Sequence, residues 1–478
     1  MGVKSRRGDR PGPAGARWLT AAARQPTRRA MHAPALPHAA SLAARIAGRT
    51  ATVSVIGLGY VGLPLARVFV ERGFRVLGFD TDPVKVEALA AGRSYIHHIG
   101  SNAIAAMNAT GRFAATADAA RLGEADALLI CVPTPLTRHR EPDMTYVVAT
   151  AETIAATLRP GQLVVLESST WPGTTEEVVK PILERTGLRS GTDIFLAYSP
   201  EREDPGTIDH STSRIPKVVG ADGEAALALA TALYDAVVPR TVPVSSAATA
   251  EAVKLTENVF RAVNIALANE LKQVYDAMGI DVWEVIGAAS TKPFGFMPFW
   301  PGPGLGGHCI PIDPFYLTWK AREHEVATRF IELAGEINTA MPRWVVQRLA
   351  DALNDRSGRG LKGARILLVG AAYKKNVDDM RESPALKIIE LLEGRGAQVD
   401  YHDPFVPALR RSREYPHLAG RRSVPWDPAL ISTYDAAMIV TDHDGVDYPG
   451  LLAACRLVVD TRNACRRAGA AGENLVLA

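Results

Sequence analysis

The sequence has little cysteine and no long apolar run. Its four cysteines, Cys131, Cys309, Cys455 and Cys465, are too few for a secreted disulfide scaffold and show no CxxC pairing typical of a zinc site. We therefore expect a reducing, cytoplasmic setting and no metal centre. No apolar stretch reaches the roughly 18 residues that a bilayer-spanning helix needs. Membrane insertion is therefore not expected.

Acidic residues are nearly absent from the N-terminus. Residues 1–50 hold ten of the 54 Lys and Arg residues but only one of the 51 acids, so the rest of the chain is mildly acidic despite a formal net charge of +3. We expect no nucleic-acid partner. Residues 1–50 show no sustained apolar period and are predicted to be a disordered extension. A transit peptide, or a true start near Met31, are the alternatives.

A β-α-β pattern begins at Ala51, in ATVSVIGLGYVGLPLARVFVERGFRVLGFDTDP. Further apolar strands are predicted to end near Cys131, Ser168 and Ser199. Strands that alternate with helical segments predict a doubly wound parallel sheet. We assign this first domain to residues 51–245.

The loop of this β-α-β unit carries GxGxxG, and an acid ends the next strand. The predicted cofactor-binding residues here are Gly57, Gly59, Tyr60, Val61, Gly62 and Asp80. Glycines allow a tight turn and close approach to a pyrophosphate, which the helix N-terminus stabilises. The carboxylate can accept from ribose hydroxyls and would repel a 2′-phosphate. The pattern therefore predicts NAD as the cofactor.

From Thr249 the apolar residues recur at helical spacing, which predicts a long helix with Gly279 as its expected end. After the linker NDRSGRGLKG the β-α-β pattern recurs, ending in Asp403, but without a full GxGxxG. We predict an α/β chain with two Rossmann-like parallel-sheet domains, the second at residues 356–478, joined by a long-helix domain at residues 246–355. The second sheet domain should bind something nucleotide-like.

Cys309 lies in GPGLGGHCIPIDPFY, which is too rich in Gly and Pro for a helix or central strand. A buried structural cysteine is one interpretation. The other is a nucleophile, because a thiolate beside a nicotinamide can capture an aldehyde covalently. Lys254 and Asn258 stand four residues apart and share a helix face, from which they could stabilise an oxyanion. On their own they also fit a solvated face.

Together these residues resemble the NAD-dependent nucleotide-sugar 6-dehydrogenases, which oxidise the C6 alcohol of a UDP-hexose to a carboxylate. The resemblance runs from about Thr52 to the C-terminus through GLGYVGLPLA, CVPTP, YSPE, KLTEN, GxGGHCxPxDP, KKNVDDMRES and DTRN. It implies an N-terminal NAD domain, a central domain with the dimer contact, and a C-terminal domain for the UDP end. We therefore expect a homodimer or higher homo-oligomer and a UDP-sugar substrate.

The resemblance also implies residue roles. Cys309 would form a thiohemiacetal and then a thioester, Lys254 and Asn258 would stabilise oxyanions, and Asp313 and Thr134 would manage the hydrolytic water. Thr134 would also help to position the cofactor, and Arg381 would reach back to it. Glu201, placed near the sugar, is also counted among the catalytic residues. The implied substrate-binding residues are Glu201, Lys254, Asn258, Phe294, Gly306, Lys374 and Arg462.

One motif departs from the UDP-glucose enzymes. They follow the YSPE-type motif with FLxEG, whereas this chain reads SPEREDPG, so that Arg202 and Glu203 replace two apolar residues. The second family acid corresponds to either Glu203 or Asp204. The variant resembles the UDP-N-acetylglucosamine 6-dehydrogenases that supply bacterial surface polysaccharides. UDP-N-acetylmannosamine and UDP-glucose are rival substrates. A two-electron hydroxyacid-type dehydrogenase and a non-catalytic NAD sensor are rival functions.

Overall fold

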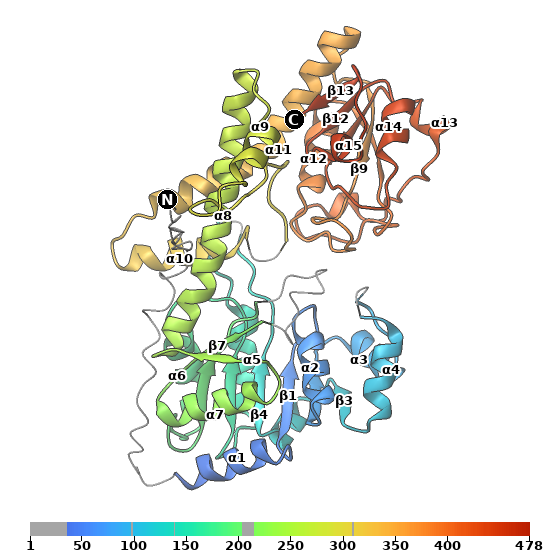
Figure 1. The fold of residues 1–478 in the computed structure, drawn as a ribbon. Coiled ribbons are helices and arrows are strands. Elements are labelled where there is room, and N and C mark those ends of the chain that lie inside the picture. Colours follow the sequence, from blue (N-terminus) through green and yellow to red (C-terminus); the bar gives the residue numbers. More distant parts are fainter. Residues whose placement is uncertain (1–35, 97–98, 138, 203–214, 308–309) are drawn as a thin grey trace, which may run out of the picture.

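The computed structural model of the 478-residue chain describes residues 36–96, 99–137, 139–202, 215–307 and 310–478 (Figure 1). Two sheet domains, at the two ends of the chain, are joined by long helices. Figure 1 shows the longest helix, α8 (Ala247–Ala277), rising from the N-terminal sheet to the side of the C-terminal domain. The predicted α/β class, with two sheet domains and a long-helix connection, is confirmed.

The N-terminal domain contains one eight-stranded sheet in the order β3-β2-β1-β4-β5-β6-β7-β8. Its strands are β1 (Thr52–Ile56), β2 (Arg75–Phe79), β3 (Phe113–Thr116), β4 (Ala127–Ile130), β5 (Leu163–Leu166), β6 (Phe195–Tyr198), β7 (Lys217–Ala221) and β8 (Thr241–Pro243). Neighbouring strands are parallel except for β6 and β7, which pair antiparallel. The sheet is therefore parallel over its first six strands, as predicted, and reverses direction at β7.

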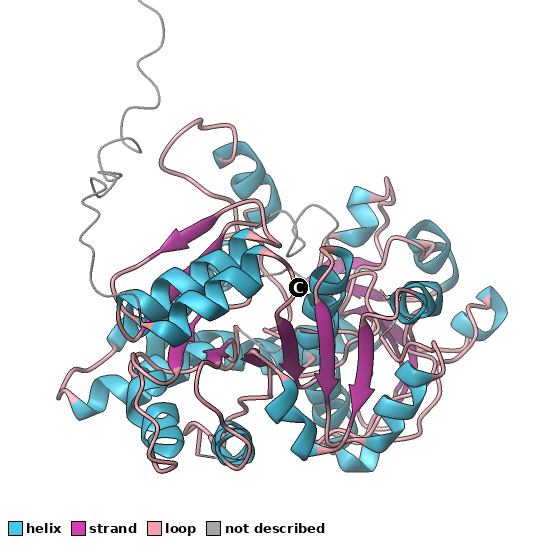
Figure 2. Ribbon diagram, turned by 90° about the horizontal axis from the view of Figure 1, so that it is seen from below, coloured by secondary structure: helices cyan, strands magenta, loops and turns pink. Residues whose placement is uncertain are grey.

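Helices cover both faces of this sheet (Figure 2). They are α1 (Pro37–Ala47), α2 (Gly62–Glu71), α3 (Pro83–Ala90), α4 (Ser101–Ala109), η1 (Ala119–Glu124), α5 (Thr145–Ala155), η2 (Thr175–Val179), α6 (Lys180–Glu184) and α7 (Glu224–Asp235). Along β4 the buried side chains alternate between two apolar clusters, with Leu129 in one and Leu128 and Ile130 in the other. Successive side chains of a strand point to opposite faces, so an all-apolar strand requires cover on both.

Helix α1 corrects the prediction of a disordered extension over residues 1–50. Leu42 and Ile46 are buried in the core of the N-terminal domain. Arg45 donates from Nη1 to Asp126 Oδ1 at 2.5 Å. Leu42 and Ile46 are only one apolar pair, four residues apart. One pair does not make a recognisable helical pattern in a segment rich in Arg and Ala. Residues 1–35 lie outside the described residues.

The central region consists of α8, α9 (Val282–Ala289), α10 (Asp313–Glu323) and α11 (Arg329–Ser357). The Ser246 side chain caps α8 by accepting from Thr249 N, and the predicted stop, Gly279, has a φ of +71°. Buried amides join the two long helices, because Asn269 on α8 donates to Asn338 on α11 at 2.9 Å. Fully paired buried amides of this kind fix the register of two packed helices.

The C-terminal domain contains a five-stranded parallel sheet in the order β10-β9-β11-β12-β13. Its strands are β9 (Arg365–Val369), β10 (Gln398–His402), β11 (Ala436–Ile439), β12 (Val458–Asp460) and β13 (Leu475–Leu477). Its helices are α12 (Pro384–Gly394), η4 (Pro416–Leu418), α13 (Pro428–Ile431), α14 (Tyr448–Ala454) and α15 (Ala464–Arg467). Asp403 follows β10 as Asp80 follows β2. Its carboxylate accepts from Ala371 N and Ala372 N at 2.7 and 2.9 Å, so it is used to hold the first loop of its own domain.

Candidate active site

The loop between β1 and α2 has the backbone geometry that its glycines predict. Gly57 has a φ of +92°, and a Cβ added there would lie 2.6 Å from the carbonyl oxygen of Cys131. A Cβ on Gly62 would lie 1.9 Å from the carbonyl oxygen of Gly57. A Cβ on Gly59, by contrast, would meet nothing within 4 Å. The first and third glycines therefore allow the turn and the helix packing, and the second leaves open space where a pyrophosphate can approach.

Asp80 is 6% exposed at the end of β2 and lies against this loop. One carboxylate oxygen accepts from Leu58 N at 2.9 Å, and the other accepts from Asp82 N at 3.0 Å. Lys85 donates from Nζ to Asp80 at 3.0 Å, a cation that the sequence pattern did not reveal. These bonds fix the carboxylate at the edge of the sheet where a dinucleotide ribose binds in such folds. The role of Asp80 toward a ribose stays a prediction.

Three predicted catalytic residues from two helices meet in one buried cluster. Asn258 on α8 donates from Nδ2 to Asp313 Oδ2 at 2.6 Å, and Asp313 is the first residue of α10. Lys254, one turn before Asn258 on the same face of α8, lies close enough to act on the Asp313 carboxylate. All three side chains are buried. The spacing of four residues therefore places the ammonium and the amide together, as predicted.

Thr134 joins this cluster through a tyrosine that the sequence analysis did not single out. Tyr316 lies one helical turn after Asp313 on α10, where side chains three residues apart share a face. Its hydroxyl donates to Pro135 O at 3.2 Å and is also hydrogen-bonded to the Thr134 side chain. Trp171, Leu255, Ile312 and Tyr316 form an apolar cluster that seats the beginning of α10.

The electrostatics of the cluster centre on Asp313, which is 1% exposed. Burial raises the pKa of Asp313 to about 6, although the Lys254 ammonium and hydrogen bonds from Asn258 and Ser169 act against this rise. Burial and the Asp313 carboxylate also raise the pKa of Tyr316. Near neutral pH, Asp313 therefore gains or loses a proton easily, which suits a group that exchanges protons with a water or substrate.

A buried carboxylate fixes α8 against the N-terminal domain. Glu251 accepts from Gly173 N at 2.5 Å, from Thr175 N at 2.9 Å and from Thr175 Oγ1 at 2.7 Å. Glu251 lies about one turn before Lys254 on the same side of the helix. These three bonds thus set the position from which Lys254 and Asn258 project. Burial raises the pKa of Glu251 to about 7.

Glu201, after β6, lies on the other side of the Lys254 ammonium. Lys254 donates from Nζ to the backbone oxygen of Glu201 at 2.5 Å. Arg202 pairs with Glu257 on α8, with one guanidinium bond of 3.2 Å. The predicted sugar-facing segment is therefore attached to the same helix as Lys254 and Asn258. Glu203 and Asp204 lie outside the described residues.

The cysteine loop is packed against the C-terminal domain. A Cβ on Gly306 would lie 2.6 Å from Tyr373 Cβ, and one on Gly302 would lie 2.5 Å from Arg462 Nη1. Gly307 donates from its backbone N to Arg381 O at 3.0 Å. Cys309, together with His308, lies outside the described residues. The part of the loop that precedes Cys309 is thus packed against Tyr373, Arg381 and Arg462 of the C-terminal domain.

Arg381 reaches from the C-terminal domain to the glycine loop of the N-terminal domain. Its guanidinium carbon lies 4.6 Å from the centroid of the Tyr60 ring, and its side chain is paired with Asp379. Lys374 is half-buried in the segment before it. Phe294 is not brought to the cluster, because its side chain is 70% exposed with its ring 5.0 Å from Lys292 Nζ.

Models of one family match all three regions. They describe the NAD binding domain (residues 51–238), the central domain (residues 248–340) and the UDP binding domain (residues 367–467) of the UDP-glucose/GDP-mannose dehydrogenase family. The UDP-N-acetyl-D-glucosamine 6-dehydrogenase of Pseudomonas aeruginosa is 38% identical over 76% of this chain and 85% of its own length. The chain belongs to the UDP-glucose/GDP-mannose dehydrogenase family.

Other members of the UDP-glucose/GDP-mannose dehydrogenase family differ in the sugar that they are named for. The UDP-N-acetyl-D-mannosamine dehydrogenase of Salmonella typhi is 35% identical over 87% of this chain and 99% of its own length. The solved structure of the UDP-D-ManNAc dehydrogenase from Pyrococcus horikoshii has a TM-score of 0.80 at 32% identity, covering 89% of this chain and 98% of that one. The prediction of an NAD-dependent UDP-sugar dehydrogenase is confirmed.

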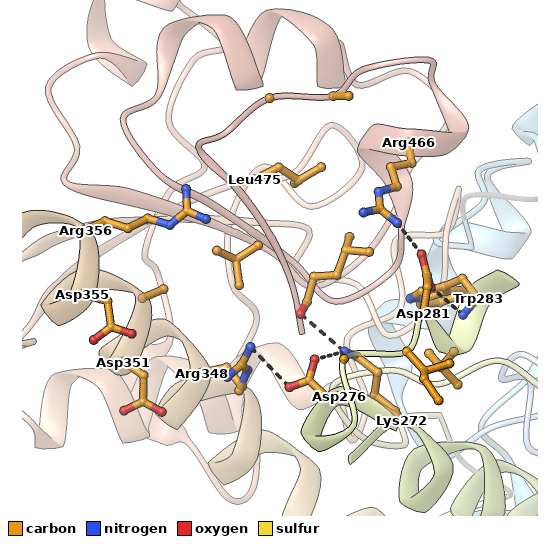
Figure 3. Close-up of a pocket in the computed structure, with 18 residues that line it drawn as sticks. Lys272, Asp276, Asp281, Trp283, Arg348, Asp351, Asp355, Arg356, Arg466 and Leu475 are labelled. Carbon is orange, nitrogen blue, oxygen red and sulfur yellow. Dashed lines mark hydrogen bonds and ion pairs between the residues drawn. The ribbon is translucent and has the colours of Figure 1, made fainter. Parts of the chain in front are cut away.

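A cavity of about 500 Å³ lies away from the catalytic cluster of this dehydrogenase (Figure 3). It is enclosed by the end of α8, by α11 and by β13. Lys272 on α8 pairs with Asp276 at 3.1 Å, and Arg348 on α11 pairs with the same acid at 3.2 Å. Lys272 stands 18 residues after Lys254, roughly 27 Å along the helix. These pairs join α8 to α11, and Lys272 also donates to the backbone oxygen of Leu477 in the C-terminal domain at 3.4 Å.

None of the helices in the described part of the chain is both long and apolar enough to cross a bilayer.

Proposed function

We propose that this dehydrogenase carries out the four-electron oxidation of the C6 alcohol of a UDP-N-acetylhexosamine, UDP-N-acetylglucosamine in particular, to the uronic acid. The observation that carries the proposal is the buried cluster of Lys254, Asn258 and Asp313. Asp313 directly follows the cysteine loop, and Tyr316 on the same helix is hydrogen-bonded to Thr134 of the NAD binding domain. The cysteine loop itself packs on the UDP binding domain.

The proposed chemistry proceeds by two oxidations and a hydrolysis. NAD bound at the glycine loop supplies the hydride acceptor for each oxidation. The first removes a hydride and a proton from the alcohol and gives an aldehyde. The Cys309 thiolate then forms a C–S bond to it, and the resulting thiohemiacetal loses a second hydride and its hydroxyl proton to give a thioester. Water adds to the thioester, the C–S bond breaks, and the carboxylate and the thiol are released.

Each residue of the cluster has a role that its position supports. The Lys254 ammonium and the Asn258 amide, four residues apart on one face of α8, would stabilise negative charge on a tetrahedral oxygen. Asp313 would take a proton from the attacking water, because its carboxylate is ionised above about pH 6. Thr134 and Tyr316, which are hydrogen-bonded to one another, would hold that water.

The N-acetyl substrate is supported by relatives and by one local contact. Both the Pseudomonas aeruginosa and the Salmonella typhi relatives are named for N-acetylated hexosamines. Arg202, which replaces an apolar residue of the UDP-glucose pattern, is anchored to Glu257 beside Asn258. This polar anchor lies next to the segment that would face the sugar. It distinguishes this segment from the apolar pattern of the UDP-glucose enzymes.

The test is a panel of UDP-sugars with NAD, in which NADH formed per sugar consumed is measured by absorbance. We expect two NADH per sugar, a carboxylate product and the highest kcat/KM with UDP-N-acetylglucosamine. One NADH with a free aldehyde or ketone would identify a two-electron dehydrogenase. NAD binding without oxidation of any sugar would identify a sensor. A higher kcat/KM with UDP-N-acetylmannosamine or UDP-glucose would correct the substrate.

A cysteine substitution tests the covalent step separately. Cys309→Ala should abolish acid formation and leave NAD binding intact, because the glycine loop and Asp80 hold the cofactor independently. Cys309→Ser, in which a serine ester hydrolyses less readily than a thioester, is the variant in which to seek a sugar adduct by intact-protein mass spectrometry. A Cys309→Ala enzyme that forms the carboxylate at near wild-type rate would show that the cysteine is structural.

We further propose a homodimer formed through the central helices. Phe260, Leu267 and Val274 recur every seven residues on α8 and are 47%, 52% and 45% exposed. An apolar row with this spacing is typical of a helix face that packs on a partner. Light scattering after size-exclusion chromatography should give twice the mass of one chain. The Leu267→Asp variant should give the mass of a single chain.

A further inference from the structure

A buried ion pair lies behind the active-site segment, in the sheet of the NAD binding domain. Lys217 begins β7, and its ammonium lies 2.6 Å from Glu167 Oε2, just after β5. The two side chains are 4% and 0% exposed. Tyr234, from α7, donates its hydroxyl to the other oxygen of Glu167, and its ring centroid lies 5.0 Å from the ammonium. The ion pair and the tyrosine thus form one connected buried network.

Stability alone does not account for this network. Taking two charges out of water costs free energy that their attraction often fails to recover, and an apolar pair of similar volume is frequently as stable. Burial lowers the pKa of Lys217, but the carboxylates of Glu167 and Glu201 outweigh this effect and keep it above its usual value. The lysine therefore stays charged in the interior, so the fold maintains a buried cation at this position.

The cation reaches the active-site segment directly. The Lys217 ammonium donates to Pro200 O at 3.3 Å and lies 3.6 Å from Glu201 Oε2. On its other side, the backbone oxygen of Glu201 accepts from Lys254. Two lysine ammoniums therefore hold the two-residue segment after β6, one from inside the domain and one from the catalytic cluster.

We propose that Lys217, held by Glu167 and Tyr234, is a positioning residue that fixes Glu201 and, through its carbonyl group, the catalytic Lys254 ammonium. This inference rests on the proposed function. Without the Lys217 ammonium, the Glu201 carboxylate would lose its nearby cation and the Pro200 carbonyl oxygen its donor, so Glu201 would shift. Lys254 would then lose the carbonyl oxygen that sets its distance from the reacting carbon.

The test replaces both charges at once, because removing only one would leave the other buried and unpaired. In Glu167→Gln/Lys217→Met the side-chain volumes are nearly kept. We expect kcat with the preferred UDP-sugar to fall about tenfold or more, since small displacements of catalytic groups from remote changes reach about a hundredfold. The KM for NAD should stay within about twofold, because the glycine loop is not part of the network.

A matched control lies at the other end of the same strand. Lys180 and Asp222, just after β7, pair at 2.8 Å with side chains 32% and 23% exposed. Lys180→Met/Asp222→Asn removes the same two charge types from the same domain. It should leave kcat within about twofold of wild type, since this pair is half-buried and touches no residue of the catalytic cluster. Equal losses of kcat in both double variants would show a general structural effect and overturn the inference.

The outcomes separate the two proposals. A folded Glu167→Gln/Lys217→Met enzyme with wild-type kcat overturns the positioning role and leaves the proposed function standing. A wild-type enzyme that oxidises no UDP-sugar overturns both. If the double variant does not fold, Tyr234→Phe tests the positioning role, because it removes only the tyrosine hydroxyl group that donates to Glu167. A fall in kcat smaller than the roughly tenfold fall expected of the double variant, at constant KM for NAD, would support the positioning role of Lys217. An unchanged kcat would overturn it.

Discussion

Asp313→Asn changes the centre of the catalytic cluster while almost preserving its shape. The asparagine oxygen can still accept from Asn258, whose present bond to Asp313 is 2.6 Å. What is lost is the negative charge beside Lys254 and the ability to take a proton. The variant therefore separates the chemistry of this position from its packing.

The expected loss of activity follows from the role of a proton acceptor. A well-placed general base contributes about 10² to 10⁴ in rate, so kcat should fall by that factor, or about 3 to 5 kcal/mol in activation free energy. Stability should change in the opposite direction. Burial raises the pKa of Asp313 to about 6. A carboxyl group with a raised pKa in the folded state destabilises the folded protein as pH rises from its unfolded-state pKa to its folded-state pKa. Above about pH 6, Asp313→Asn should therefore be more stable than the wild type by up to about 3 kcal/mol in unfolding free energy.

The assay follows kcat from about pH 5 to about pH 9, together with thermal unfolding at about pH 8. The wild type should lose activity below about pH 6, as Asp313 becomes protonated, and this acidic limb should be missing in Asp313→Asn. Asp427→Asn, which alters an exposed helix cap in the UDP binding domain, is the control. Activity of Asp313→Asn within about fivefold of wild type, with the acidic limb retained, would refute the assignment.

Three further results are expected. Arg381→Met should raise the KM for NAD, because the guanidinium packs on Tyr60 in the glycine loop. The expected increase is about two- to thirtyfold, the range of one cation–π contact. Steady-state kinetics measure this KM, and an unchanged value would contradict the prediction. NAD should be strongly preferred to NADP, and Lys85→Met should widen the ratio of their kcat/KM values because it removes the ammonium placed to neutralise a 2′-phosphate. Deleting residues 1–35 should leave the melting temperature unchanged. Deleting residues 1–48 also removes the buried side chains of Leu42 and Ile46, and should lower the free energy of unfolding by about 3 to 6 kcal/mol, as measured by denaturant titration.

Much of the fold was predictable because its signals are local. The strand, glycine loop, helix and acid of the first unit are contiguous, and Gly62 is demanded by a contact with Gly57 within that unit. The space at Gly57 is limited instead by Cys131, which follows β4. The pairing of Lys254 with Asn258 was predictable from helix periodicity alone. Their contact with Asp313, 55 residues away from Asn258, came from the resemblance to a family and from no local pattern.

The residues that sequence analysis missed depend on long-range packing. Lys217 and Glu167 are 50 residues apart and meet because β5, β6 and β7 are adjacent in the sheet. Nothing in KVVGA or LVVLESST distinguishes these charges from solvated strand ends. The burial of α1 likewise depends on a groove that only the folded domain provides. In both cases the decisive information is which surfaces lie opposite one another, and that is a property of the topology.

The glycines of the cysteine loop were interpreted from the sequence as excluding a helix or central strand, and the structure gives a packing reason for two of them. Gly306 and Gly302 have no room for a Cβ because Tyr373 and Arg462 of the UDP binding domain occupy that space. Gly307 is bonded to the carbonyl group of Arg381, in the same domain. The loop that carries the proposed nucleophile is thus held by the domain that would bind the UDP end of the substrate. A movement of that domain would therefore also move the loop residues that precede the cysteine, through the contacts of Gly302, Gly306 and Gly307.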